Sequence, residues 1–324
     1  MRMCITFGFH RDIVDLSCSS YDLQMRRRVF WACYNLDRHI SISTGRPFAI
    51  SDQDIDCQLP ADIDDYVDAA TPSSITNPSR SVARDSAMSC FIRQVHLQRI
   101  ESRIYQSIYR VDKKVCSEDS EIDAFLAELT EWRKTMPREI YKRSKSEYMA
   151  FGNDLTMVAY HKTIRLLLYP QLFLYHINLA YLKTCANACA ELLEIHKRRY
   201  TSTAYDLNLM ALNSVYASGL TLIYCIWINP QEIFGINTSA GISACSIVLH
   251  VMAERWVGAK KYCDSFEFIS KCILEFLGHQ PSPVPRQGLL ENGEGLRESV
   301  KGLQMDENGR FQCFRMLDDI IGES

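Results

Sequence analysis

The 324-residue sequence predicts an all-α protein, a large multi-helix bundle with a mobile C-terminal tail. Two observations support this fold class. Apolar residues recur at intervals of three and four through most of the chain, which is the spacing of one helix face. Alternating apolar and polar runs bounded by turn dipeptides, the pattern of strands and hairpins, are absent over any useful length.

The first long helix is expected to begin after Ser19, because Ser19 and Asp22 have the spacing of a capping box. Gly45 offers the left-handed turn that ends a helix, and Pro47 prevents it from resuming. Between these limits, apolar side chains cover nearly every face, so other helices should enclose this one. These residues are Val29, Phe30, Trp31, Tyr34, Leu36 and Ile40.

Residues 61–84 are polar and aperiodic and are expected to form a loop. A second helix should span Phe91–Val111, and a third should run from a Ser120/Asp123 cap to Pro137. Five further helices are predicted at Asp154–Tyr169, Asn178–Arg199, Asp206–Ile228, Ser239–Trp256 and Lys260–Leu277.

The segment Leu207–Gln231 carries no charge and reaches the length of a membrane span. Polar residues such as Asn208 and Asn213 interrupt it, so a core helix of a soluble bundle is expected instead, with no membrane partner. Residues 1–277 should form one folded domain. Residues 278–324, which begin with three closely spaced prolines, should form a flexible tail with a short amphipathic terminal segment.

Composition and charge exclude several functions. A net charge of −3 provides no basic field that would draw the chain onto DNA. The thirteen cysteines are scattered and contain no CxxC pair, so they are expected to be buried apolar side chains of a reducing compartment. The N-terminal apolar run is too short for a signal peptide. No metal, cofactor or catalytic site is predicted within this sequence.

Charged residues within and beside the first long helix form the candidate site. Asp37 and Arg38 lie in the middle of an apolar helix, and Arg46 follows its end. Either arginine could bind Asp37 through two nitrogens, which the planar guanidinium permits and lysine does not. Removing one partner of such a buried pair is expected to cost about 3–5 kcal/mol. The pair should therefore matter for folding.

The segment from Arg26 to Pro60 resembles the signature of the fungal-specific transcription factor domain, the helical middle region of fungal zinc-cluster transcription factors. The strings YHKTIRLLLYP, TLIYCIWINP and ACSIVLHVMAERWVGAKKYCDSFEFI resemble later blocks of that family in the right order, although the first lacks the family's arginine before proline. The likeness covers about Arg2 to Phe276. The residues that carry the signature are Arg27, Trp31, Asp37, Arg38, Gly45, Arg46 and Pro47.

The resemblance implies a regulatory domain that acts in the nucleus, in transcription by RNA polymerase II. Its implied partners are transcriptional coregulators, a homo- or heterodimer partner, and a small-molecule inducer. In the family, DNA is bound by an N-terminal six-cysteine cluster that holds two zinc ions. Cys4, Cys18 and Cys33 stand about a dozen residues apart, so DNA contact is expected only through a cluster absent from this sequence.

Two alternatives remain open. One is an interaction module without DNA contact that dimerises with an intact relative. The other is an all-α enzyme, for which no recognised catalytic string is present.

Asp52, Asp54 and Asp56 imitate a calcium loop, but Cys57 and Ile63 replace its essential glycine and glutamate. These carboxylates are therefore expected to be solvated or to cap a helix.

Overall fold

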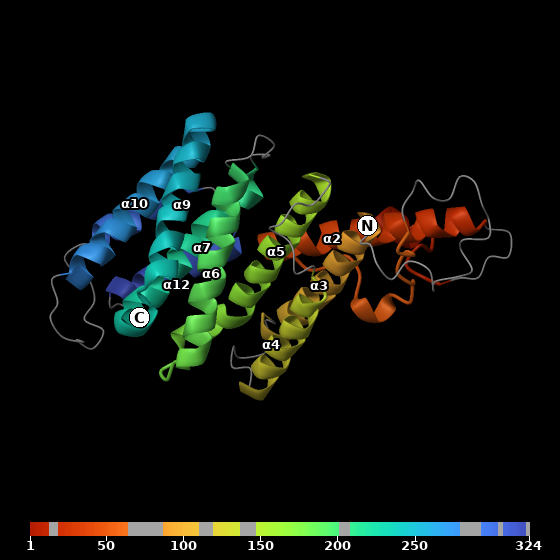
Figure 1. Ribbon diagram of the computed structural model, residues 1–324, viewed down its shortest axis with the longest axis horizontal. Helices are drawn as coiled ribbons and strands as arrows, with labels where there is room; N and C mark the ends of the chain where they lie inside the picture. The colour runs from red at the N-terminus through yellow and green to blue at the C-terminus, as the bar shows by residue number, and fades with distance from the viewer. Residues whose placement is uncertain are drawn as a thin grey trace. The chain divides into compact units, whose positions relative to one another are not determined.

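The computed structural model describes residues 1–12, 19–63, 87–109, 119–136, 147–200, 208–278, 293–303 and 307–321. The described residues contain helices and connecting segments and no strand, which confirms the all-α prediction (Figure 1). The chain divides into two compact units. Unit 1 comprises Met1–Ile42, Arg46–Ser107 and Asp123–Thr156; unit 2 comprises Ser43–Gly45, Ile108–Ile122 and Met157–Ser324.

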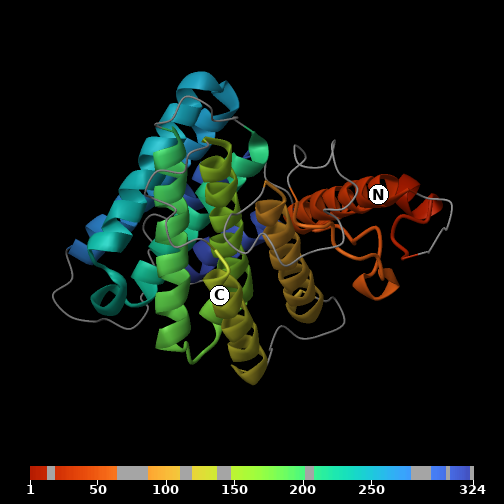
Figure 2. The same ribbon diagram turned by 45° about the vertical axis from the view of Figure 1, so that its right-hand side comes forward.

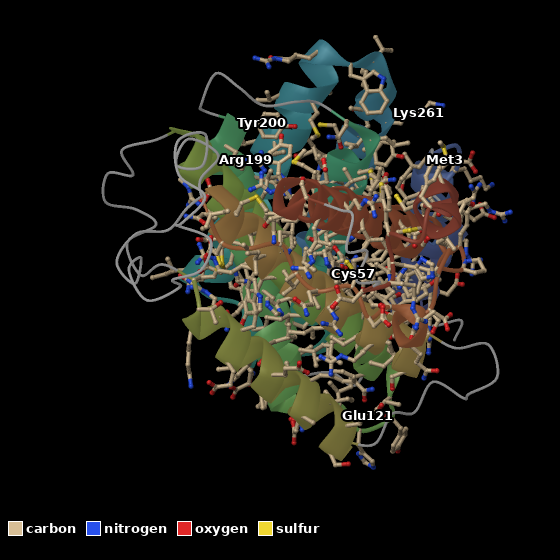
Figure 3. All side chains as sticks on the ribbon, turned by 90° about the vertical axis from the view of Figure 1, so that its right-hand side faces the viewer. Met3, Cys57, Glu121, Arg199, Tyr200 and Lys261 are labelled. Atoms are coloured by element: carbon tan, nitrogen blue, oxygen red, sulfur yellow. The ribbon has the colours of Figure 1, made fainter. Side chains whose placement is uncertain are left out.

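Unit 1 is organised around one long helix. It contains α1 (Arg2–Thr6), most of α2 (Ser20–Thr44), the 3-10 turn η1 (Asp52–Asp54), α3 (Ala87–Ile108), the greater part of α4 (Asp119–Lys134) and the start of α5 (Glu147–Leu168). Its core is a cluster of apolar side chains from α1, α2, α3 and the segment after η1: Cys4, Phe30, Trp31, Tyr34, Cys57 and Val95. Cys57 lies inside this packing and Met3 on the surface (Figure 3).

The start and end of α2 follow from their sequence. At the start, the Ser19 hydroxyl accepts the Asp22 amide N–H at 3.1 Å and donates to the Asp22 carboxylate at 2.7 Å. At the end, Gly45 has φ 66°, a left-handed conformation that costs glycine little. The Arg46 amide then donates to the Ser41 carbonyl at 2.9 Å, which is the Schellman pattern that stops a helix.

Unit 2 is a bundle in which α6 (Leu179–Tyr200), α7 (Leu209–Ile228), α9 (Ile236–Arg255) and α10 (Val257–Gly278) pack against one another (Figures 1 and 2). The short element η3 (Tyr169–Phe173) lies between α5 and α6, and α8 (Pro230–Ile233) lies between α7 and α9. Helices α6 and α9 approach closely at Gly241, where an added Cβ would lie only 2.9 Å from the Ala190 Cα.

Two helices of the described chain, α7 and α9, are long and apolar enough to cross a membrane by length and composition. Most of α7 is buried inside unit 2, including the run from Leu220 to Trp227. That burial is what the sequence analysis expects of a core helix in a bundle.

The helix predictions agree closely with the observed elements, with differences of a few residues at their ends. The predicted loop 61–84 lies almost wholly outside the described residues, as does Val111. Helix α5 begins at Glu147, earlier than the predicted Asp154, and α1 and α8 have no counterpart among the predictions.

The predicted tail contains two described helices, α11 (Gly293–Val300) and α12 (Glu307–Ile321). Helix α11 packs on α10, and α12 packs on α7. Five apolar side chains of α12 are buried: Cys313, Met316, Leu317, Ile320 and Ile321. The Tyr169 hydroxyl donates to the Gln312 carbonyl at 2.8 Å, and Arg297 forms an ion pair with Asp318 at 2.8 Å. The amphipathic terminal segment is thus a helix packed within unit 2. Helix α11 has no counterpart among the predictions, because glycines and charges dominate its sequence.

Candidate functional site

Arg38 is the centre of the candidate site. Its side chain is fully buried in unit 1, although arginine is almost never fully buried unless it is paired. Its Nη1 donates to Asp37 at 2.8 Å, and its Nη2 donates to Asp52 at 2.9 Å and to the Ile50 carbonyl at 2.8 Å. Its Nε donates to the Ser102 hydroxyl at 3.2 Å. One guanidinium therefore joins α2 to the segment after Pro47 and to α3.

Asp52 is the second charged member of the site. It accepts hydrogen bonds from the Tyr34 hydroxyl at 2.7 Å and the Ser102 hydroxyl at 2.6 Å, in addition to Arg38. Burial alone would raise the pKa of this carboxyl. The hydrogen bonds from Ser102 and Tyr34, with the positive charge of Arg38, outweigh burial and lower the pKa below its usual value. Asp52 is therefore ionised at neutral pH.

Two aromatic rings flank the guanidinium. The Arg38 Cζ lies 4.3 Å from the ring centroid of Tyr34 and 4.2 Å from that of Phe48. Rings at such distances attract a cation through their quadrupoles. We call Arg38 with Tyr34, Asp37, Phe48, Asp52 and Ser102 the Arg38 cluster.

The Arg38 cluster is suited to holding structure and poorly suited to catalysis. The guanidinium has no exposed surface, and all three of its nitrogens donate to protein oxygens. Burial also raises the pKa of Tyr34 above its usual value, so the hydroxyl stays protonated and donates to Asp52. A substrate would have no open side from which to reach these groups.

The structure separates the two arginines that were candidates for binding Asp37. Arg38 contacts Asp37 through one nitrogen and reaches Asp52 with another, so its two ends bind different carboxylates. Arg46 is exposed, as are Gly45 and Pro47. Asp37 also accepts the Ala49 amide N–H at 3.2 Å, which helps to fix the chain after Pro47.

The remaining signature residues lie on the N-terminal half of α2. Arg27 forms an ion pair with Asp12 at 3.2 Å. Trp31 is 2% exposed, donates its indole N–H to the Gln58 carbonyl at 2.9 Å, and packs edge-on against Phe30 and Tyr34. These contacts attach α2 to the segments on either side of it in sequence.

Sequence reasoning missed three members of the cluster and misjudged a fourth. Tyr34 was identified only as an apolar face residue, and Phe48 and Ser102 were not singled out. Asp52 was expected to be solvated or to cap a helix; Ser51 caps η1, and Asp52 binds Arg38. A signal was available, because a buried arginine needs more acceptors than Asp37 alone provides, and Asp52 is the next acidic residue along the chain.

The other two carboxylates of the aspartate series have different surroundings. Asp56 pairs with Arg11 at 3.0 Å and accepts the Asp12 amide N–H, and Asp54 is exposed. Among the residues that the structure describes, no three histidine, cysteine or acidic side chains are grouped to hold a metal ion. The eleven cysteines in that part of the chain are free thiols, and most are buried.

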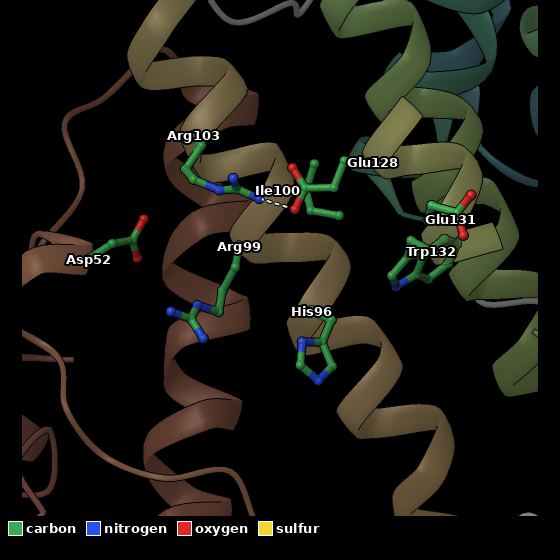
Figure 4. A pocket seen from close by; sticks show the side chains of 8 residues that line it. All are labelled: Asp52, His96, Arg99, Ile100, Arg103, Glu128, Glu131 and Trp132. Carbon is green, nitrogen blue, oxygen red and sulfur yellow. Dashed lines mark hydrogen bonds and ion pairs between the residues drawn. The ribbon is translucent and has the colours of Figure 1, made fainter. Parts of the chain in front are cut away.

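A cavity of about 490 Å³ lies beside the Arg38 cluster in unit 1. Side chains of α3 and α4 face one another across it, and Asp52 contributes from η1 (Figure 4). Its lining residues are Asp52, His96, Arg99, Ile100, Arg103, Glu128, Glu131 and Trp132.

Most charges around this cavity have partners. Arg103 pairs with Glu128, Glu131 pairs with Lys134, and Asp52 binds Arg38. Arg99 lies over the Trp31 ring at 5.9 Å. Burial and the neighbouring charge of Arg99 lower the pKa of His96, so that imidazole is neutral at pH 7. Arg99 thus brings a positive charge to a cavity of ligand-binding size.

Comparison with known proteins gives one consistent answer. Residues 1–142 match the family model described as "Fungal specific transcription factor domain". The uncharacterized transcriptional regulatory protein YLR278C of Saccharomyces cerevisiae is 25% identical over 74% of this chain and 19% of its own length. Protein STB5 of Saccharomyces cerevisiae is 25% identical over 95% of this chain and 42% of its own length.

Pyrimidine pathway regulatory protein 1 of Saccharomyces cerevisiae is 21% identical over 85% of this chain and 31% of its own length. The chain therefore spans about a fifth to two fifths of the length of these curated relatives. No solved structure matches it. Residues 1–142, which contain the Arg38 cluster, thus match the fungal-specific transcription factor domain, and two of these three relatives are named as regulatory proteins.

Proposed function

We propose that this chain is the regulatory region of a fungal zinc-cluster-type transcription factor and acts in the nucleus, in transcription by RNA polymerase II. The observation that supports this most is the match of residues 1–142 to the domain family, combined with similarity to a named regulatory protein over 85% of the chain. In this proposal, residues 1–277 carry the regulatory function, and helices α11 and α12 of the C-terminal segment pack on α10 and α7.

In the proposed mechanism, the chain does not itself bind DNA. Its net charge of −3 and its scattered cysteines support this part of the proposal. DNA would be reached through a zinc cluster outside the present sequence, and no zinc or other cofactor would bind here. The chain would instead hold a surface for transcriptional coregulators, and the Arg38 cluster would keep that surface in shape.

The names of two relatives, YLR278C and pyrimidine pathway regulatory protein 1, describe regulatory proteins, and the Arg38 cluster offers no open reactive group. Both observations favour a regulatory role over an enzymatic one. A buried charged cluster that joins three segments is a device for fixing one conformation. A regulator needs such a fixed surface in order to discriminate between partners.

A tethering experiment tests the proposal. The chain would be fused to a bacterial operator-binding domain and expressed in a fungal cell that carries a reporter gene behind that operator. We expect reporter transcription to change severalfold relative to the operator-binding domain alone. The Arg38→Ala variant should lose the effect, whereas the exposed Arg46→Ala variant should keep it.

An unchanged reporter with a folded, nuclear fusion protein would contradict the proposal. If the free chain instead reduces transcription driven by a full-length relative, the alternative applies, and the chain is an interaction module that dimerises with that relative. The two results differ in whether the chain must be tethered to DNA, so one set of strains distinguishes them.

We further propose that the cavity beside Asp52 receives a small-molecule inducer that carries a carboxylate. Arg99 supplies the positive charge, and a guanidinium can bind a carboxylate through two nitrogens. A panel of aromatic carboxylates should raise the melting temperature of the wild-type chain and not that of Arg99→Gln. Equal shifts in both proteins would place the binding elsewhere.

A further inference from the structure

Helix α1 contributes one buried side chain to unit 1. The helix has five residues, and Cys4 is the buried one, with 7% of its surface exposed. A helix this short is not stable by itself, so its place depends on its contacts with the rest of unit 1. Cys4 belongs to the apolar core of the unit, together with Phe30, Trp31 and Tyr34 of α2.

The Cys4 thiol meets a second thiol at this core. It forms a hydrogen bond with the side chain of Cys33 on α2, and Cys33 packs against the same core cluster. Both residues are free thiols. Thiols in hydrogen-bond contact need only a small shift to reach the geometry of a disulfide. Helix α1 can make that shift, because Cys4 is its one buried residue.

The two thiols differ in their exposure. Cys4 is buried and Cys33 is partly exposed, so an oxidant in solution reaches Cys33 first. Burial, with the hydrogen bond to Cys33, raises the pKa of the Cys4 thiol. Cys4 is therefore suited to close a bond on an already oxidised Cys33, and poorly suited to attack the oxidant directly.

Unit 2 offers a comparison within the same chain. There, the Cys185 thiol forms hydrogen bonds with Cys189 and Cys225. These three thiols are at most 1% exposed, so an oxidant cannot reach them while the bundle is folded. Of these two groups of contacting thiols, the one in unit 1 has an accessible member.

We infer that Cys4 and Cys33 form an oxidation site, at which a small disulfide oxidant converts the two thiols into a disulfide between α1 and α2. With glutathione disulfide, the Cys33 thiolate attacks one sulfur, so a bond from Cys33 to glutathione forms and one glutathione leaves as its thiolate. The Cys4 sulfur then loses its proton and attacks Cys33, and the second glutathione leaves. Two protein thiols are oxidised, and one glutathione disulfide is reduced to two thiols.

The bond would close a loop over residues 4–33 and fix α1 on α2. Closing such a loop restricts the unfolded chain and so stabilises unit 1. Disulfides in reducing compartments are usually transient and redox-sensing, so this bond would form during an oxidising shift and be reduced afterwards. The inference concerns the covalent state of unit 1, and its failure would not affect the transcriptional role, which the tethering experiment reads separately.

Peptide mapping of the folded, intact chain tests the inference. The chain would be incubated with glutathione disulfide, alkylated without reduction and digested with trypsin. Cleavage at the flanking arginines leaves Cys4 in peptide 3–11 and Cys33 in peptide 29–38, each as the one cysteine of its peptide. We expect this linked pair to be at least about tenfold more abundant than any other cysteine pair, because the two thiols are already in contact. Dithiothreitol should remove it.

Serine variants and hydrogen exchange complete the test. Cys4→Ser and Cys33→Ser should each lose the linked peptides. Cys90→Ser is the matched control, since it removes another partly buried thiol of unit 1, one that contacts Thr156, and it should keep them. In the oxidised wild type, exchange of the α2 amides should slow roughly a hundredfold, and this effect should be absent from Cys4→Ser and Cys33→Ser.

Several results would overturn the inference. Glutathione that stays on Cys33 without a link to Cys4 would show that the two sulfurs cannot reach each other. Linked peptides that form only in urea would assign the pairing to the unfolded chain. Oxidation of Cys185, Cys189 and Cys225 as fast as that of Cys33 would show that opening of the fold, and not exposure, controls the reaction.

Discussion

Replacing Arg38 by alanine is the most direct test of how the domain is stabilised. The substitution removes four hydrogen bonds and two ring contacts at once. It leaves Asp52 facing Tyr34 and Ser102 without a cation, and leaves the Ile50 carbonyl without that donor. The loss therefore includes the cost of an uncompensated, partly buried carboxylate as well as the lost contacts.

The magnitude follows from burial. Breaking a buried ion pair by removing one partner costs about 3–5 kcal/mol. The Arg38 side chain is 0% exposed, but Asp37 and Asp52 are 12% and 20% exposed, so solvent can partly compensate the two carboxylates. We therefore expect a loss of about 3 kcal/mol in the free energy of unfolding, toward the lower end of that range. Arg38→Lys should lose less, because it keeps the charge but not the planar array of donors.

Urea unfolding with hydrogen exchange of α2 peptides measures this loss. Because the chain divides into two units, a single fluorescence transition need not report unit 1 alone, whereas exchange of α2 amides does. Arg46→Ala is the matched control, since Arg46 is exposed and should change the stability by less than about 0.5 kcal/mol. A loss below about 1 kcal/mol for Arg38→Ala, or equal losses for both variants, would refute the reasoning.

Four further outcomes are expected. Asp37→Ala should lower the free energy of unfolding in urea by about 1–3 kcal/mol, which is less than for Arg38→Ala, because Arg38 keeps Asp52 as a partner. A larger loss for Asp37→Ala than for Arg38→Ala would show that Asp52 does not compensate. Folding lowers the pKa of Asp52, so the stabilisation from its ionised carboxylate should be complete above the unfolded pKa of about 3.9. This stabilisation should disappear as the pH falls through the folded pKa. The difference in unfolding free energy between wild type and Asp52→Asn should therefore shrink in acid. Burial, with the nearby charge of Arg199, lowers the pKa of His196 to about 3. The unfolding free energy of unit 2 should therefore fall by about 1.4 kcal/mol for each pH unit as the pH is lowered from about 6.5 to 3. His196→Gln should reduce this slope in thermal melts at stepped pH. Gly241→Ala should cost about 1–3 kcal/mol because its Cβ would meet the α6 backbone, whereas Gly278→Ala, which meets nothing within 4 Å, should not destabilise; equal melting temperatures for the two variants would contradict the close approach of α6 and α9.

The sequence predicts α2 well because each signal there is local. A capping pair at Ser19 and Asp22, an apolar body and Gly45 all act within a few residues of where they stand. Helix periodicity also shows that Trp31 must be buried. It cannot identify the partner, because the Gln58 carbonyl lies 27 residues away.

The partners of Arg38 illustrate the same limit more strongly. Ser102 is 64 residues from Arg38, and nothing near either residue indicates the contact. The sequence indicates Asp37 as a partner because it is adjacent to Arg38, whereas it leaves Asp52 as a solvated or helix-capping carboxylate. The sequence does not indicate helix α11, because glycines and charges dominate its composition, although Leu296 and Val300 are buried within unit 2.

The carboxylate of Asp52 has two roles: it helps to line the cavity, and it neutralises the buried Arg38. A charged molecule that enters the cavity would alter the electrostatic balance around that carboxylate, and thus the strength with which three segments of unit 1 are held together. Thermodynamic reciprocity requires the converse, that a change in the stability of the Arg38 cluster alters binding in the cavity by the same factor. For the proposed inducer, the single side chain of Asp52 would thus connect the cavity to the Arg38 cluster.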